Sequence, residues 1–242
     1  MANLSGEWLR NVERRGVPRR VVDEIARRHG ITPDSFRVLA DMEEVTDPDG
    51  NAFFVIPPGT AGDRVRRAAL LTYVLNAGTG YATAGKPADF PATPFSAAEV
   101  ARIADRQSAN AWSYTRDVRF VHRNGGRLVT TPNGMLMGAG GNWIQRQFTR
   151  RGGTTWGDIF MLNLGALSDP ADQLRGIVRS GRAWRLDLER LLHHEERHCR
   201  QWAARGYPGM IRDYGSELLR EYVFGKTNRL EEDAGLSDGG YR

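Results

Sequence analysis

The feature that most constrains this chain is a cluster of histidines near its C-terminal end. Three of the five histidines lie within six positions, in the run His193-His194-Glu195-Glu196-Arg197-His198. Apolar and aromatic side chains recur around this run at steps of three and four, and Gly206 and Pro208 follow it, which predicts a helix ending near residue 205. Polar side chains in this run fall on the stripe predicted to face inward, where a polar group without a partner is costly. The fold must therefore supply partners for them.

The spacing within the run suits a metal ion. Residues four apart on a helix are offset by about 40°, so His194 and His198 project from one face and both imidazoles can reach one ion. Glu195 lies about 100° round the helix from His194, beside the ion, which suits a general base. H-E-x-x-H is the spacing that zinc peptidases use. We therefore expect Zn²⁺ bound by His194 and His198, with Glu195 as a catalytic residue.

A catalytic zinc ion usually has three protein ligands and one open position, so a third ligand is needed. The downstream carboxylates are candidates, and spacing alone does not choose between them. They are Glu217 and Glu221, on a helix predicted over about 210–224, and Glu231, Glu232 and Asp233 on the next helix. The competing interpretation is a solvated helix face, for which the charged residues Glu189, Glu196, Arg197 and Arg200 are typical.

The run from His194 to His198, followed by Gln201-Trp202, resembles the active-site helix of zincin metallopeptidases, and a ligand Glu on a later helix is typical of the gluzincin group. The tail from Asn228 to Tyr241 resembles the ending of uncharacterised bacterial proteins that pair an H-E-x-x-H helix with N-x-x-E-x-x-A-G. This resemblance covers about residues 186–241 and implies Glu231, in preference to Glu217, as the third metal ligand.

The chain departs from the gluzincin pattern in one position. The familiar ligand helix has an Asp four residues after its Glu, where it holds a ligand histidine, and this chain has Gly235 there. Asp233, Asp238 or a backbone carbonyl would have to take that role, because a metal-bound imidazole needs an acceptor at its other nitrogen.

The resemblance implies a zinc metallopeptidase that hydrolyses peptide bonds. The zinc ion would lower the pKa of a bound water towards about 7, and Glu195 would take its proton and deliver it to the leaving nitrogen. Tyr207, Tyr214 and Tyr241 are candidates to stabilise the oxyanion, and Tyr214 is preferred. A strand over 157–162 is expected at a sheet edge beside the metal, where an extended peptide could pair with it; the alternative is a core strand.

The whole chain predicts an α+β fold in two parts. Residues 1–90 are expected to be a mainly helical region, with two short helices in the first thirty residues, a hairpin from 36–39 and 52–56, and a helix over 62–75. Residues 91–242 are expected to form a compact zincin-like domain with a small sheet and the active-site helix. In it, a capping box at Ser96 opens a helix to about residue 107, and 117–121 and 127–131 form a hairpin around Asn124-Gly125.

Composition narrows the function further. With 40% hydrophobic and 26% charged residues the chain is typical of globular proteins, and no apolar run approaches the roughly 18 residues of a membrane span. The single cysteine excludes a four-thiolate zinc site. The net charge of +5 is mild and scattered, so nucleic-acid binding is not expected. The expected partner is a peptide or protein substrate; the alternatives are a non-catalytic metal-binding or interaction protein and, third, a basic nucleic-acid-associated protein.

The N-terminal sequence lacks the apolar segment and cleavage site of a secretory signal. We therefore expect the protein to be cytoplasmic, or exported by a route without a classical signal peptide. Compact domains of this kind resemble toxin modules used in bacterial competition, which adds an exported bacterial effector or toxin as a hypothesis.

Overall fold

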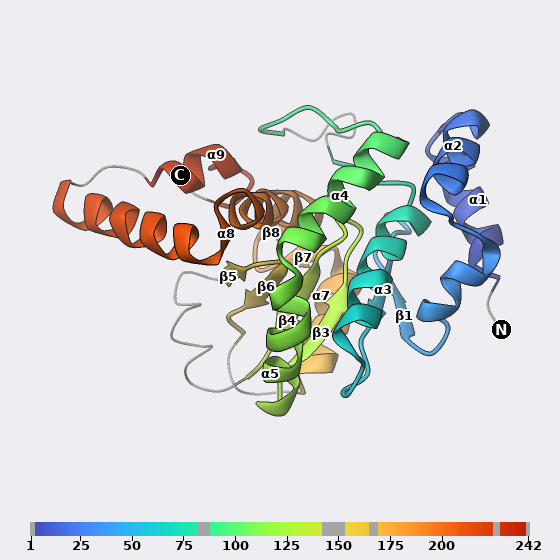
Figure 1. The fold of residues 1–242 in the computed structure, drawn as a ribbon. Helices are drawn as coiled ribbons and strands as arrows, with labels where there is room; N and C mark the ends of the chain where they lie inside the picture. Colours follow the sequence, from blue (N-terminus) through green and yellow to red (C-terminus); the bar gives the residue numbers. More distant parts are fainter. Residues whose placement is uncertain (1–2, 82–87, 142–152, 165–168, 225–227, 241–242) are drawn as a thin grey trace.

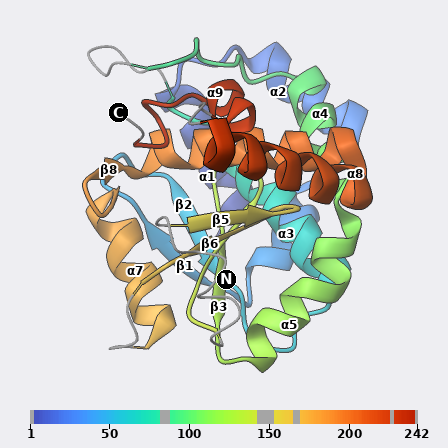
Figure 2. The same ribbon diagram turned by 90° about the vertical axis from the view of Figure 1, so that its left-hand side faces the viewer.

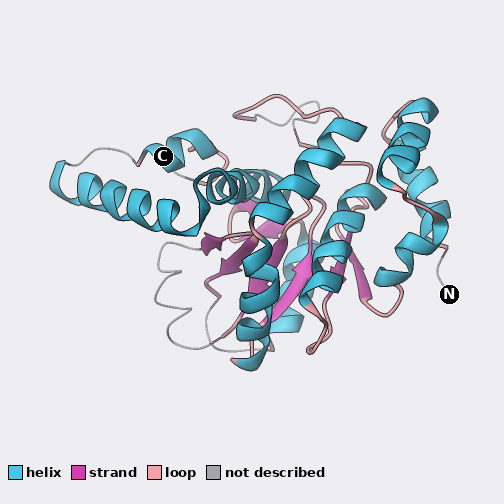
Figure 3. Cartoon of the chain, viewed as in Figure 1, coloured by secondary structure: helices cyan, strands magenta, loops and turns pink. Residues whose placement is uncertain are grey.

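The structure is a computed structural model that describes residues 3–81, 88–141, 153–164, 169–224 and 228–240, and of residues 214–224 it describes the backbone alone. The fold is α+β, as expected, with helices packed around a six-stranded mixed sheet (Figure 1). Figure 3 shows the strands gathered in the middle of the molecule and the helices around them.

The first half of the described chain holds four α-helices, a 3-10 helix and two strands. They are α1 (Leu4–Arg14), α2 (Arg19–His29), η1 (Pro33–Leu39), β1 (Glu43–Thr46), β2 (Ala52–Val55), α3 (Gly62–Leu75) and α4 (Ala97–Ala109). The second half begins with a π-helical turn and carries the remaining strands and helices. These are η2 (Ser113–Asp117), α5 (Val118–Arg123), β3 (Arg127–Thr130), β4 (Leu136–Ala139), β5 (Gly153–Trp156), β6 (Ile159–Leu162), α7 (Pro170–Ser180), β7 (Arg182–Ala183), β8 (Leu186–Asp187), α8 (Leu188–Phe224) and α9 (Arg229–Ala234).

The sheet has the strand order β1-β2-β3-β4-β6-β5, and every pairing in it is antiparallel except the parallel pair β4 and β6. The prediction of an edge strand at 157–162 is wrong. Within that segment β6 pairs with β4 on one side and β5 on the other, and all four of its side chains are buried, so it is a core strand. The edge strand on this side of the sheet is β5, whose four residues are half-buried, and α8 crosses above it (Figure 2).

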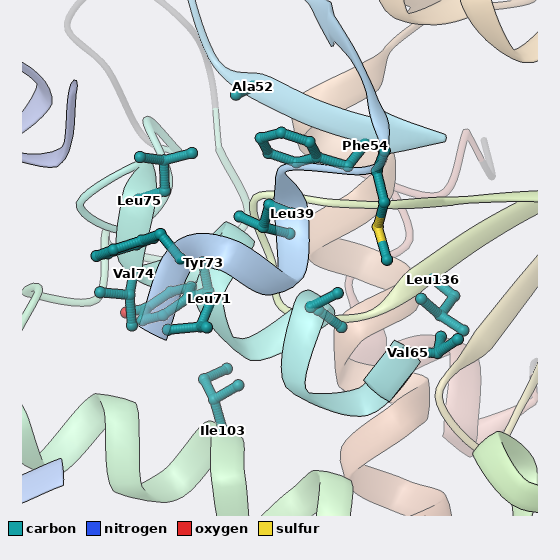
Figure 4. Close-up of a cluster of buried hydrophobic side chains, with 14 of the residues drawn as sticks. Leu39, Ala52, Phe54, Val65, Leu71, Tyr73, Val74, Leu75, Ile103 and Leu136 are labelled. Atoms are coloured by element: carbon teal, nitrogen blue, oxygen red, sulfur yellow. The ribbon is translucent and has the colours of Figure 1, made fainter. Parts of the chain in front are cut away.

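Both faces of the sheet are buried, and the side chains of β2 show how. Ala52 and Phe54 belong to the hydrophobic cluster on the face covered by α1, α3 and α4, whereas Phe53 and Val55 belong to a second cluster with α7 and the start of α8. Figure 4 shows Phe54 among Leu39, Leu71 and other side chains of the first cluster. A strand alternates its side chains between faces, so a fully apolar strand is buried on both.

Local signals predicted several elements correctly. The structure contains α1, α2, α3 and β2 close to the expected ranges, and Gly30 ends α2 in the left-handed conformation. The hydroxyl of Ser96 accepts a hydrogen bond from the backbone N–H of Glu99 at the start of α4, as the capping box predicts.

Two predicted strands are helical instead. Residues 36–39 belong to η1, because Thr32 and Ser35 form a capping box that starts a helical turn at Pro33. Residues 117–121 end η2 and begin α5, in which Val118 and Val121, three apart, are buried while Phe120 is 44% exposed. Short apolar runs fit both the period of a helix and that of a strand, and packing against the rest of the fold made these two segments helical.

The predicted boundary near residue 90 does not separate two packed units in the described chain. Phe54 and Val55 of β2 pair with Thr130 and Val129 of β3, so one sheet runs through both predicted regions. The first hydrophobic cluster likewise extends in sequence from Leu4 to Met161. The described residues before this boundary therefore form part of the scaffold against which the C-terminal helices pack.

The long helix α8 bends where the sequence predicts an end. Gly206 has φ 66° and ψ 168°, which is not helical, and Pro208 follows it, so α8 consists of two helical segments joined at this kink. Among the described residues, no helix combines the length and the apolar character that a membrane span requires.

Candidate metal centre

Three side chains from two helices converge on one point. The Nε2 atoms of His194 and His198 on α8 are 3.1 Å apart, and the Oε2 atom of Glu231 on α9 is 3.3 Å from each of them. In a tetrahedral zinc site with bonds of about 2.0–2.1 Å, neighbouring ligand atoms are about 3.3 Å apart. The three atoms therefore already have the spacing of three corners of a zinc tetrahedron. The structure brings together the residues that sequence and resemblance selected.

The protonation of His194 follows from its hydrogen bonds. Its Nδ1 lies 2.9 Å from the carbonyl oxygen of Gly235, which can only accept, so Nδ1 carries the hydrogen. In the neutral ring, the lone pair is then on Nε2, the atom that faces His198 and Glu231. Gly235 is the position where the gluzincin pattern has an Asp, and here its backbone carbonyl supports the histidine.

His198 is oriented through an amide. Its Nδ1 donates to Oε1 of Gln201 at 2.9 Å, and the amide group of Gln201 donates to the carbonyl of Leu230 at 2.8 Å and to Oδ2 of Asp233 at 2.9 Å. These two acceptors determine which end of the amide is oxygen. Asp233 thus supports a ligand histidine as expected, but through Gln201 and not by direct contact.

Three electron-rich atoms this close together require a positive charge between them. Burial by itself would lower the pKa of His198, but the hydrogen bond to Glu231 and the nearby carboxylates outweigh it and raise this pKa to about 9. Burial likewise opposes ionisation of Glu231, yet the hydrogen bonds from His194 and His198 hold its pKa far below the usual range. Without a metal the site is suited to a proton, and a divalent cation can replace it.

Glu195 lies beside the three ligand atoms, 7% exposed, and is held by a residue that sequence reasoning missed. The hydroxyl of Thr155, on the edge strand β5, donates to Oε2 of Glu195 at 2.6 Å, and the backbone carbonyl of Thr155 accepts from the indole N–H of Trp202 at 3.0 Å. No other hydrogen bond to Glu195 occurs among the described residues. Oε1 is thus left available to accept a proton.

The C-terminal residues close one side of the centre. Asn228 caps α9 by accepting from the N–H of Leu230, and beyond α9 the chain turns back so that Gly239 lies against the ring of His194. A Cβ atom on Gly239 would be 2.7 Å from Nε2 of His194. Asp238, expected as a possible support for a ligand, instead accepts from the hydroxyl of Tyr81 and from Nε of Arg190 and so anchors this turn.

Glu196 is buried, so the interpretation of this helix face as solvated is wrong for it. It is 2% exposed and forms ion pairs with Arg106, which is 4% exposed, and with Arg102 and Arg200. Arg106 of α4 also pairs with the fully buried Asp158 at 3.2 Å. These contacts dock α8 on α4 and determine the rotation of the helix that presents the ligands.

Two other residues of the predicted helix, His193 and Cys199, do not belong to this group of three side chains. His193 is buried and stacks on Tyr81, with ring centroids 3.5 Å apart and planes 6° from parallel. Cys199 is buried in the second hydrophobic cluster, where its thiol contacts the sulfur of Met135, consistent with packing. The side chains of Tyr214, Glu217 and Glu221 and the whole of Tyr241 lie outside the described part of the chain.

Tyr207, the remaining oxyanion candidate, is 36% exposed, and its ring lies among those of Trp112, Trp156 and Trp202.

Comparisons of the chain with models of protein families, with curated proteins and with solved structures found no match. The function must therefore be inferred from the geometry of the site.

Proposed function

We propose that this protein is a zinc-dependent metallopeptidase in which His194, His198 and Glu231 hold the metal and Glu195 is the general base. The observation that carries the proposal is the triangle of ligand atoms with sides of 3.1, 3.3 and 3.3 Å, with both histidine Nδ1 atoms bound by acceptors. A zinc ion in this site would polarise a peptide carbonyl and activate water for attack.

The position of Glu195 supports its role as the general base. It follows His194 directly, so its carboxylate lies beside the ligand atoms, and the bond from Thr155 fixes the direction of that carboxylate. A base held in one orientation can take a proton on one side of the reaction and return it to the leaving nitrogen.

The number of ligands supports a catalytic role over a purely structural one. A structural zinc site normally has four protein ligands, whereas a catalytic site keeps one position for water or substrate. Among the described residues, His194, His198 and Glu231 form the group, with no fourth histidine, cysteine or carboxylate in it. The strand β5 beside Glu195 also lies at an edge of the sheet, the position at which an extended peptide can pair with a sheet, which suits a peptide substrate.

The test combines metal analysis with hydrolysis of an unfolded protein substrate. We expect about one zinc per chain in the wild type, loss of zinc in His194→Ala and Glu231→Ala, and retained zinc in Glu195→Gln with hydrolysis reduced by about 10²-fold or more. Glu232→Ala is the matched control for Glu231→Ala, because Glu232 is the exposed neighbour on the same short helix and should keep the zinc.

Each outcome tests a different part of the proposal. Hydrolysis by Glu195→Gln at the wild-type rate would refute the assigned base, and zinc loss in Glu217→Ala but not in Glu231→Ala would refute only the third ligand. A wild-type protein that binds zinc and cleaves no peptide bond would instead support the alternative of a non-catalytic metal-binding protein.

A further inference from the structure

An aromatic cluster of side chains from α8, β5 and the residue before η2 lies beyond the metal ligands. It consists of Trp112, Trp156, Trp202 and Tyr207, whose ring centroids are between 4.8 and 6.3 Å apart. Trp202 is 4% exposed and forms the floor of the cluster, Trp112 and Trp156 are half-buried, and Tyr207 is 36% exposed. The proposed zinc chemistry uses none of these rings.

The phase of the helix connects this cluster to the catalytic centre. Trp202 comes seven residues after Glu195, and seven residues of α-helix turn through about 700°, so the two side chains leave α8 in nearly the same direction about 10 Å apart. Thr155 on β5 contacts both of them, with its hydroxyl to Glu195 at 2.6 Å and its carbonyl to the indole of Trp202 at 3.0 Å. The next residue of the strand, Trp156, is itself part of the cluster.

The surface of the cluster suits an apolar side chain. Aromatic rings offer large apolar faces, and Ile211, one turn of α8 after Tyr207, is a further apolar residue that is 43% exposed. The guanidinium of Arg116 lies 5.2 Å from the ring centroids of Trp112 and Tyr207 and pairs with Asp117 at 2.6 Å, so a cationic substrate side chain would find both these rings and this carboxylate already occupied by a cation. The chemistry therefore favours aromatic and large aliphatic side chains and disfavours lysine and arginine.

Resting on the proposed peptidase function, we propose that the aromatic cluster is a substrate subsite that binds a bulky apolar side chain, preferentially aromatic, of the peptide being cleaved. An extended peptide advances about 3.3 Å per residue, so a span of about 10 Å from Glu195 corresponds to a residue two or three positions from the cleaved bond. The occupant is a side chain of the substrate, and its backbone runs along β5.

The test is a set of fluorogenic peptides that carry Phe, Ser or Lys at each of the three positions on either side of the cleaved bond, assayed with the zinc-loaded protein. We expect one position, two or three residues from that bond, at which Phe gives a kcat/KM at least tenfold higher than Ser, with Lys the poorest. Tyr207→Ala should bring the Phe-to-Ser ratio towards one, mainly through KM, and Tyr207→Phe should keep it because the ring remains.

Leu9→Ala is the matched control, since Leu9 on α1 is an apolar residue of similar exposure, 39%, and its loss should leave all rates unchanged. In zinc-loaded Glu195→Gln, binding of the Phe peptide should change the tryptophan fluorescence, and binding of the Ser peptide should change it less. If the wild type cleaves the peptides but shows no preference for Phe two or three residues from the cleaved bond, the subsite alone is overturned. No cleavage of any peptide would overturn the proposed function as well. Equal loss of kcat on all peptides in Tyr207→Phe would assign Tyr207 to oxyanion stabilisation and refute the subsite role.

Discussion

Replacing Gly239 by alanine should weaken zinc binding at the proposed metal centre without altering a ligand. Gly239 lies in the turn after α9, against the imidazole of His194, and a Cβ atom there would be 2.5 Å from Cε1, 2.7 Å from Nε2 and 2.8 Å from Nδ1 of that ring. The φ of Gly239 is not positive, so alanine suits the backbone and the effect comes from the contact alone.

The size of the effect follows from these distances. Atoms in van der Waals contact are about 3.5 Å apart, so Nε2 of His194 must move by about 0.8 Å, against a tolerance of about 0.2 Å in metal–ligand distances. If the turn lifts instead, the carbonyl of Gly235 leaves Nδ1 and the histidine loses its support. Either relaxation weakens the site, and loss of such support costs about 10–100-fold in metal affinity, or about 1.4–2.7 kcal/mol.

The measurement is a competition titration of zinc against a chelator, with thermal unfolding of the metal-free protein as a check on folding. The matched control is Gly176→Ala, since Gly176 lies exposed in α7 and a Cβ atom there would meet no neighbouring side chain or strand within 4 Å. That variant should bind zinc like the wild type and gain about 0.5–1 kcal/mol of stability, because alanine favours a helix interior. A Gly239→Ala protein that binds zinc within twofold of the wild type would refute the placement of the turn against His194.

Three further predictions test the surroundings of the site. Thr155→Val should retain zinc but lose about tenfold or more in kcat, because a hydrogen bond to a charged group is worth about 1.5–3 kcal/mol. Thr155→Ser keeps the hydroxyl and should restore most of this rate. Equal rates in the Val and Ser variants would contradict the positioning role of Thr155. Gln201→Leu should weaken zinc binding about 10–100-fold in the chelator titration, since His198 then has no acceptor at Nδ1, and unchanged affinity would disprove that support. Glu196→Gln should cost about 3 kcal/mol in urea unfolding near neutral pH, because it leaves Arg106 buried beside one fewer anion. Burial opposes ionisation of Glu196, but Arg106, Arg200 and Arg102 outweigh it and lower its pKa to about 2, so this stability is present above the usual pKa of 4.5 and is lost as the pH falls towards 2. The difference between wild type and Glu196→Gln should shrink over that interval, and a constant difference would refute the assignment.

The sequence could predict those features of the site that depend on a single helix. The relation of His194 to His198 depends only on helical geometry, and apolar periodicity with a glycine and proline beyond it predicts the helix. The apolar periodicity also predicted that the helix face carrying His194 and His198 points inward. The burial of Glu196 was not predicted, because its partner Arg106 lies on a helix 90 residues earlier in the chain.

The remaining part depends on contacts between elements distant in sequence. Spacing along the chain could not choose Glu231 over Glu217, and that choice depended on resemblance, because the carboxylate that reaches the histidines depends on how α9 packs against α8. Thr155 had no local signal, since a threonine in a strand of half-buried residues is ordinary. The edge position of β5 in turn depends on β6 pairing with β4, a parallel contact over more than twenty residues.

The glycines of the C-terminal turn show why the departure from the gluzincin pattern is compatible with a metal site. An Asp side chain and a backbone carbonyl are both acceptors for Nδ1 of a histidine, and here the carbonyl of Gly235 takes that position at 2.9 Å. For the backbone to come this close, the chain must turn sharply, and Gly235 does so with φ 93°, a conformation that a side chain would strain. The turn then passes directly over the imidazole at Gly239, where there is no room for a Cβ atom. The backbone support of His194 in this structure therefore depends on glycine at both positions, because Gly235 makes the turn and Gly239 leaves room for the imidazole.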